Sequence, residues 1–147
     1  MKIYLIALML LIGFGLSLHL SMNSQVGSIL KNQRMGNAIF WTIGAFTAII
    51  IGLSDWDPTV FTRLKDVPLW LLTAGIMGGA LVFGIAWTMP QLGAGRAFVL
   101  MIAGQVISGM LFSHFGWFGS PVERISIAKF SGALLLVAGA AIVTLAK

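Results

Sequence analysis

The chain has 147 residues, of which 59% are hydrophobic and only 9% are charged. Soluble domains carry about 25% charged residues, so this composition excludes a globular protein with a hydrated surface and predicts an all-α integral membrane protein with a single membrane domain, residues 1–147. The formal net charge is +5, but the basic residues stand singly between apolar segments, so we expect them to meet lipid headgroups and not nucleic acid.

Five apolar segments are long enough to cross a bilayer, which takes about 20 residues. In chain order, the expected spans are residues 3–30, 36–54, 68–89, 96–113 and 126–146. The first follows Lys2 as a signal peptide would, but it lacks an A-x-A cleavage site, so we expect it to remain as a helix. Charges, glycines and prolines mark the turns between the spans, and Pro90 is expected to end the third.

The first span carries polar side chains on two faces. At about 100° per residue, one face holds Gly15, His19 and Asn23, and the roughly opposite face holds Gly13, Ser17, Ser21, Ser24 and Ser28. Polar side chains at membrane depth usually face the interior of a helix bundle. We expect the serine face to pack against another helix. His19 and Asn23 border a polar cavity or, alternatively, form hydrogen bonds between helices.

Three residues of later spans complete the candidate substrate-binding set. Gln105 in the fourth span has the same two interpretations as Asn23. Trp41 and Trp87 lie deep in their spans, where an indole can stack on a ligand, attract a cation or pack against a helix. The candidate site residues are therefore His19, Asn23, Gln105, Trp41 and Trp87.

The acidic residues all fall between the expected spans, at Asp55, Asp57, Asp66 and Glu123. No carboxylate is therefore available inside a span to carry a proton or a cation, and His19 is the side chain there that can change charge near neutral pH. Cysteine is absent, and GAGRA (residues 93–97) lacks the spacing of a phosphate-binding loop. We expect no enzymatic activity, no cofactor and no metal, and an ion channel is disfavoured because no span offers a ring of charges.

The distribution of basic residues hardly favours one orientation of the chain in the membrane over the other. If the chain crosses the membrane five times, nine basic residues divide between the two sides. Five lie on one side, Lys2, Arg63, Lys65, Arg124 and Lys129, and four lie on the other, Lys31, Arg34, Arg96 and Lys147. Because an excess of Lys and Arg sets the cytoplasmic side, this balance favours insertion in both orientations, unless another feature sets the orientation. Pairs of small residues four apart, at Gly75 and Gly79, Gly104 and Ser108, and Ala128 and Gly132, indicate close helix packing within or between subunits.

Several segments together resemble the YdcZ-type family within the drug/metabolite transporter superfamily. AGQ followed by an HFG turn is the most specific part, and the resemblance covers nearly the whole chain. The segments are GFGLSLHLSMNSQVG (13–27), WTIGAFTAII (41–50), PLWLLTAGIMGGALVF (68–83), PQLGAG (90–95), IAGQVISGMLFSHFGWFG (102–119) and SGALLLVAGA (131–140).

The resemblance implies half of a ten-helix transporter fold in the bacterial inner membrane. Such a half pairs antiparallel with a second copy or a related chain. The expected function is the transport of a small polar metabolite or amphiphile by alternating access, and the expected direction is export. The family pattern leads us to expect Gln at the position of His19. The alternative is a non-transporting assembly or regulatory subunit of another transporter.

Overall fold

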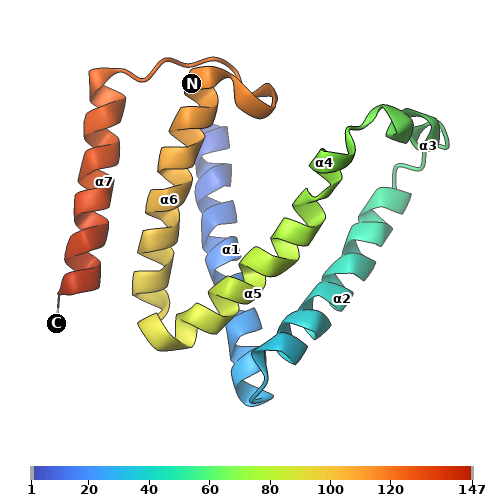
Figure 1. Ribbon diagram of the computed structural model, residues 1–147, viewed down its shortest axis with the longest axis horizontal. Helices are drawn as coiled ribbons and strands as arrows, with labels where there is room; N and C mark the ends of the chain where they lie inside the picture. Colours follow the sequence, from blue (N-terminus) through green and yellow to red (C-terminus); the bar gives the residue numbers. More distant parts are fainter. Residues whose placement is uncertain (1, 147) are drawn as a thin grey trace. The chain divides into compact units, whose positions relative to one another are not determined.

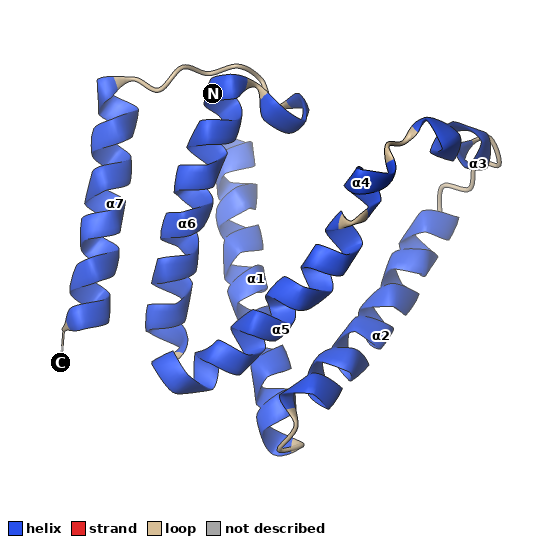
Figure 2. Ribbon diagram, viewed as in Figure 1, coloured by secondary structure: helices blue, strands red, loops and turns tan. Residues whose placement is uncertain are grey.

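The computed structural model describes residues 2–146 and, within them, contains helices and no strands (Figure 2). Five stretches are long and apolar enough to cross a membrane, which confirms the expected all-α membrane fold. Their bounds are α1 (Ile3–Ile29), α2 (Gln33–Leu53), α4 and α5 together (Leu69–Leu72 and Ala74–Leu92), α6 (Ala94–Phe115) and α7 (Ile127–Leu145). Short helices α3 (Val60–Arg63), η1 (Leu64–Asp66) and η2 (Trp117–Gly119) lie in the connections. Lys147, counted above among the basic residues, lies outside the described residues.

The chain forms two compact units, residues 1–91 and residues 92–147. In the first unit α1 packs against α2, and in the second α6 packs against α7 (Figure 1). Most large apolar side chains are exposed in both units. In a bilayer such side chains meet lipid or another helix, because lipid tails are as apolar as leucine.

The turn between α1 and α2 is closed by backbone hydrogen bonds. Lys31 adopts a left-handed conformation with φ of 50°. The Asn32 N–H donates to the Gly27 carbonyl at 3.0 Å, and the Lys31 N–H donates to the Ser28 carbonyl at 3.1 Å. These two bonds form a Schellman motif, which satisfies the last carbonyls of a helix. The Asn32 side chain then caps α2 by accepting the Met35 N–H at 3.1 Å.

Two glycines allow α1 and α2 to cross almost in backbone contact just after this turn. A Cβ added at Gly36 would lie 2.6 Å from the Gly27 Cα and 2.8 Å from the Gly27 nitrogen. Both glycines are buried. By contrast, a Cβ added at Gly75, Gly79, Gly104 or Gly132, the glycines of the four-residue pairs, would meet nothing within 4 Å. The close crossing in the first unit is therefore made by a different pair of glycines.

Pro90 does not end the third span, as the sequence led us to expect, because α5 continues through it to Leu92. Proline has no N–H, so the Ala86 carbonyl, four residues earlier, lacks its usual partner in the helix. The Ser24 hydroxyl of α1 donates to this carbonyl at 3.1 Å, and both residues are buried. A neighbouring helix thus supplies the hydrogen bond that the proline removes.

The connection between α6 and α7 folds back onto the end of α6. Gly116 has a left-handed φ of 66° and ends the helix. The Glu123 N–H then donates to the Ser113 carbonyl at 2.9 Å, and the Ile125 N–H donates to His114 Nδ1 at 3.2 Å. These bonds hold the residues that precede α7 beside the end of α6.

Arg96, near the start of α6, reaches the other end of α7. Its Nη2 donates to the carbonyl of Ala146 at 3.0 Å. The free carbonyls at a helix C-terminus carry partial negative charge, which a guanidinium stabilises. Arg96 therefore links the two helices of its own unit.

Candidate functional site

The candidate site is a groove of about 320 Å³ between α1 and α2. The face of α1 that carries Gly15, His19 and Asn23 forms part of its wall, and Ile39, Phe40 and Ile43 of α2 form another part. Leu18, Met22 and Val26 complete the lining. Residues spaced three and four apart share one face of a helix, so one stripe of each helix faces the groove.

His19 lies against the aromatic ring of Phe40. Their ring centroids are 4.4 Å apart with an interplanar angle of 49°. His19 is exposed in the unit formed by residues 1–91, and none of the hydrogen bonds among the described residues involves its ring nitrogens. The imidazole is therefore positioned by ring contact, and its nitrogens remain open to a ligand or water.

Asn23 is the largest fully buried side chain of the described residues, with 1% exposure. Its Nδ2 donates to Asn37 Oδ1 of α2 at 3.5 Å, and the Asn37 Nδ2 donates to the Gly79 carbonyl of α5 at 3.3 Å. Two amide side chains thus connect three helices. The Asn23 Oδ1 is buried and has no hydrogen-bond partner among the described residues. An unpaired buried acceptor costs about 1–3 kcal/mol, so Asn23, a residue that lines the groove, carries an acceptor whose hydrogen bond is not satisfied.

The serine face of α1 contacts other helices through Ser24 and Ser28. Ser24 is the member whose hydroxyl donates to another helix, at the Ala86 carbonyl. The hydroxyls of Ser17, Ser21 and Ser28 donate to carbonyls four residues earlier in α1. Two serines of this face therefore bond to other helices, since Ser28 Oγ also accepts a hydrogen bond from Gln33 Nε2 of α2 at 3.3 Å.

The two candidate tryptophans do not line the groove. Trp41 is 39% exposed and packs over Gly78 of α5, where an added Cβ would lie 3.5 Å from the indole Cη2. It also meets Phe40 edge to face, with ring centroids 6.0 Å apart. Trp87 is 56% exposed on α5. Trp41 thus supports the ring that contacts His19.

Gln105 lies on α6, in the second unit, and its side chain is exposed there. It does not line the groove between α1 and α2. Of the five candidates, the structure therefore brings His19 and Asn23 together in one cavity.

Asn37 and Phe40 are site residues that the sequence analysis missed. The expected second span begins at residue 36, whereas α2 already begins at Gln33. Asn37 and Phe40 are three residues apart and so share a face of that helix. An asparagine at this spacing from an aromatic residue was the available signal.

Charged side chains lie away from the groove. Asp55, Asp57 and Glu123 are in connections, and Asp66 is in η1, so among the described residues no acid lies in a membrane-spanning helix. Hydrogen bonds from the side chain and backbone of Thr59, with a smaller contribution from Arg63, hold the pKa of Asp57 below its usual range. No group of His and acidic residues that could hold a metal ion occurs in the described part of the chain.

Residues 4–142 match the protein family described as "Putative inner membrane exporter, YdcZ". The chain is also 26% identical over 113 residues to the inner membrane protein YdcZ of Escherichia coli (strain K12), covering 77% of this chain and 70% of that protein. No solved structure matches the chain. The family match reaches into all five apolar helices. This chain therefore belongs to the YdcZ family of membrane transporters and is a multi-pass protein of the bacterial inner membrane.

Proposed function

We propose that this chain exports a small polar metabolite or amphiphile across the inner membrane as an antiparallel dimer. The observation that carries the proposal is the unpaired Asn23 Oδ1, buried in the wall of a groove that also holds His19. A buried acceptor without a partner favours a ligand with an N–H or O–H group. The apolar remainder of the lining favours a ligand with an apolar part.

The size of the groove supports a small substrate. Its volume of about 320 Å³ lies at the lower end of the range for small-molecule sites, about 300–1,000 Å³. Transporters built from inverted halves bind their substrates near the bilayer midplane, between the halves. In this proposal the groove with His19 and Asn23 is the binding site, and the two subunits rock to expose it alternately to each side.

Transport by variants of the groove tests the proposed site. The purified full chain is first screened by thermal shift against metabolites and cationic amphiphiles, including ethidium and tetraphenylphosphonium, and stabilising compounds are assayed for uptake into proteoliposomes. Replacing Asn23 with alanine removes one hydrogen bond to the substrate, so we expect uptake to fall about fivefold to tenfold. Thr47→Ala is the control, because the Thr47 hydroxyl donates to its own helix at the Ile43 carbonyl, outside the groove.

His19→Gln separates hydrogen bonding from titration at the same position. Of the residues that line the groove, His19 is the one with an ionisable side chain. Glutamine keeps a donor and an acceptor, so we expect uptake to persist with a flatter profile between about pH 5 and pH 8. Unchanged uptake in Asn23→Ala and an unchanged pH profile in His19→Gln would remove both residues from the site.

Dual topology is tested with reporters fused to the C-terminus. Because the basic residues divide five against four between the two sides, we expect both a cytoplasmic and a periplasmic reporter to be active. A triple variant shifts this balance. Gln33→Lys and Gln91→Lys add positive charge on the side of the C-terminus, and Lys65→Gln removes a positive charge from the other side. This variant is expected to place the C-terminus in the cytoplasm. A single location for the unmodified chain would contradict a dual-topology homodimer.

The assembly subunit is the competing function. Copurification with a larger membrane complex, together with no stabilisation by any compound of the screen, would identify the chain as such a subunit. Stabilisation and uptake by the isolated chain would support the transporter.

A further inference from the structure

The HFG turn at the end of α6 holds one of the two histidines of the chain. His114 lies in the last turn of α6, and Gly116 ends the helix in a left-handed conformation. The Nδ1 atom of His114 accepts a hydrogen bond from the Ile125 N–H at 3.2 Å, and both residues are half-buried. All of these residues lie within the unit formed by residues 92–147. The transport proposed for the groove between α1 and α2 does not involve this histidine.

The donor of this hydrogen bond fixes the protonation state of the imidazole. A backbone N–H can only donate, so Nδ1 presents its lone pair, and the ring proton of the neutral histidine lies on Nε2. A doubly protonated imidazolium has a donor at each nitrogen and no acceptor. The contact with Ile125 therefore exists only while His114 is uncharged.

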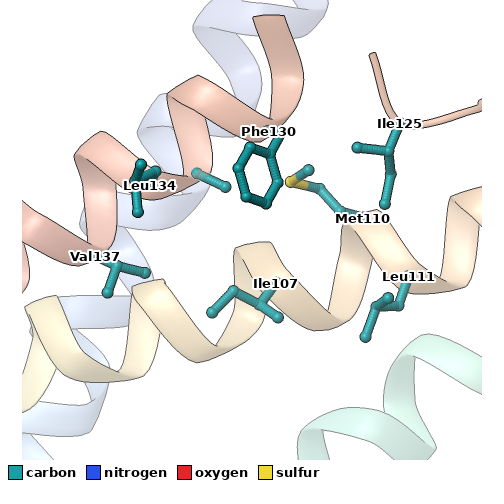
Figure 3. A pocket seen from close by; sticks show the side chains of 8 residues that line it. Ile107, Met110, Leu111, Ile125, Phe130, Leu134 and Val137 are labelled. Carbon is teal, nitrogen blue, oxygen red and sulfur yellow. The ribbon is translucent and has the colours of Figure 1, made fainter. Parts of the chain in front are cut away.

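Ile125 occupies a position that determines how α7 begins. Ser126 caps α7 by accepting the Lys129 N–H at 3.2 Å, so Ile125 is the residue directly before the cap. A hydrophobic residue there often packs against the fourth residue of the helix, here Phe130, and fixes the angle at which the chain enters the helix. Both residues line the groove of about 310 Å³ between α6 and α7 (Figure 3). The bond to His114 thus anchors the entry of α7 to the last turn of α6.

A second backbone hydrogen bond joins the same connection to α6, and its acceptor does not change charge. The Glu123 N–H donates to the Ser113 carbonyl at 2.9 Å. Loss of the contact with His114 would therefore free Ile125 and the start of α7, whereas residue 123 would stay beside α6.

The charged groups around this end of α6 keep their charge near neutral pH. Within this unit, the connection carries Glu123 and Arg124, α7 carries Lys129, and η2 carries no charged residue. The Lys129 Nζ donates to Glu123 Oε2 at 2.6 Å, and this hydrogen bond and the charge of Lys129 hold the pKa of Glu123 below its usual range. Lysine and arginine lose their protons only well above neutral pH. Of the groups at this end of the unit, the imidazole is therefore the type that changes charge between about pH 5 and pH 8.

We propose that His114 is a pH-sensitive switch at the entry of α7. Neutral His114 accepts the Ile125 N–H and holds the start of α7 beside α6. Protonation removes the acceptor, and the imidazolium is instead stabilised by the partial negative charge at the C-terminus of α6. The two charge states thus favour two positions of the residues that precede α7. The contact is present at higher pH and is lost as the pH falls.

Amide hydrogen exchange of the purified full chain in detergent micelles, resolved by NMR, tests the proposal. The protection factor of the Ile125 amide, which corrects the exchange rate for the intrinsic effect of pH, is compared at about pH 8 and about pH 5. One hydrogen bond between uncharged groups corresponds to about fivefold in an equilibrium, so we expect protection at Ile125 to fall about fivefold on acidification. The Glu123 amide is the internal control and is expected to change less.

Two substitutions of His114 separate its acceptor from its charge. Asparagine carries an acceptor oxygen on Cγ, where histidine carries Nδ1, and does not change charge. His114→Asn is therefore expected to keep Ile125 protected at both pH values, whereas His114→Phe lacks the acceptor and is expected to lower its protection at both. His19→Gln is the matched control, because it replaces the other histidine and is expected to leave the pH response of Ile125 unchanged. Circular dichroism checks that each variant keeps its helices.

Three results would overturn the proposal. Equal protection of Ile125 at both pH values in the unmodified chain would exclude the switch. A pH response that persists in His114→Asn, or one that His19→Gln abolishes, would assign the response to another group. The measurement is amide exchange and not uptake, so none of these results depends on whether the chain transports a substrate.

Discussion

Gly36→Ala is expected to lower the free energy of unfolding by about 1–3 kcal/mol, the usual cost of overpacking. The added methyl group would lie 2.6 Å from the Gly27 Cα, so the backbones of α1 and α2 would have to separate. The groove that holds His19 and Asn23 lies between the same two helices, so we also expect weaker ligand binding. Unfolding by sodium dodecyl sulfate, followed by circular dichroism, measures the loss of stability.

Two further glycine substitutions serve as controls. A Cβ at Gly44, also in α2, would meet nothing within 4 Å. Gly44→Ala is therefore expected to be neutral or to stabilise the helix by about 0.5–1 kcal/mol. A Cβ at Gly27 would meet mainly the Gln33 side chain, whose carboxamide can move, so Gly27→Ala should have an intermediate effect. Equal stabilities for Gly36→Ala and Gly44→Ala would contradict the close crossing.

Ser24→Ala is expected to destabilise the chain by about 1–3 kcal/mol, because it leaves the buried Ala86 carbonyl without a donor. The effect should depend on Pro90. In a Pro90→Ala background the new N–H can bond to the Ala86 carbonyl within α5, so the same serine substitution should cost little. The free energies of unfolding of the two single variants and the double variant measure this coupling.

Ser21→Ala is the matched control for this cycle. The Ser21 hydroxyl donates to the Ser17 carbonyl at 2.8 Å within α1, and that carbonyl keeps its backbone partner in the helix. We expect a change within about 0.5 kcal/mol. If Ser24→Ala costs the same with Pro90 and with Ala at position 90, the serine does not compensate for the proline.

Part of the candidate site followed from the sequence. His19 and Asn23 are four residues apart and therefore share a face of α1, and the structure places both in one groove. The partner helix could not be identified in this way, because nothing in the pattern of α1 specifies Asn37 or Phe40 as neighbours. Trp41 could equally have faced a ligand or a helix, and it lies against Gly78.

The sequence by itself determined that the chain forms five membrane-spanning helices without an acid inside them, because bilayer thickness requires about 20 apolar residues for each crossing. Only the tertiary structure decided that Gly36 crosses Gly27 and that Ser24 satisfies the carbonyl freed by Pro90. The physical reason lies in the solvent. Lipid tails are as apolar as the side chains of a neighbouring helix, so hydrophobicity shows that a helix enters the membrane but not which of its faces meets another helix. Those contacts depend on small residues and single hydrogen bonds, which become visible when the helices are placed together.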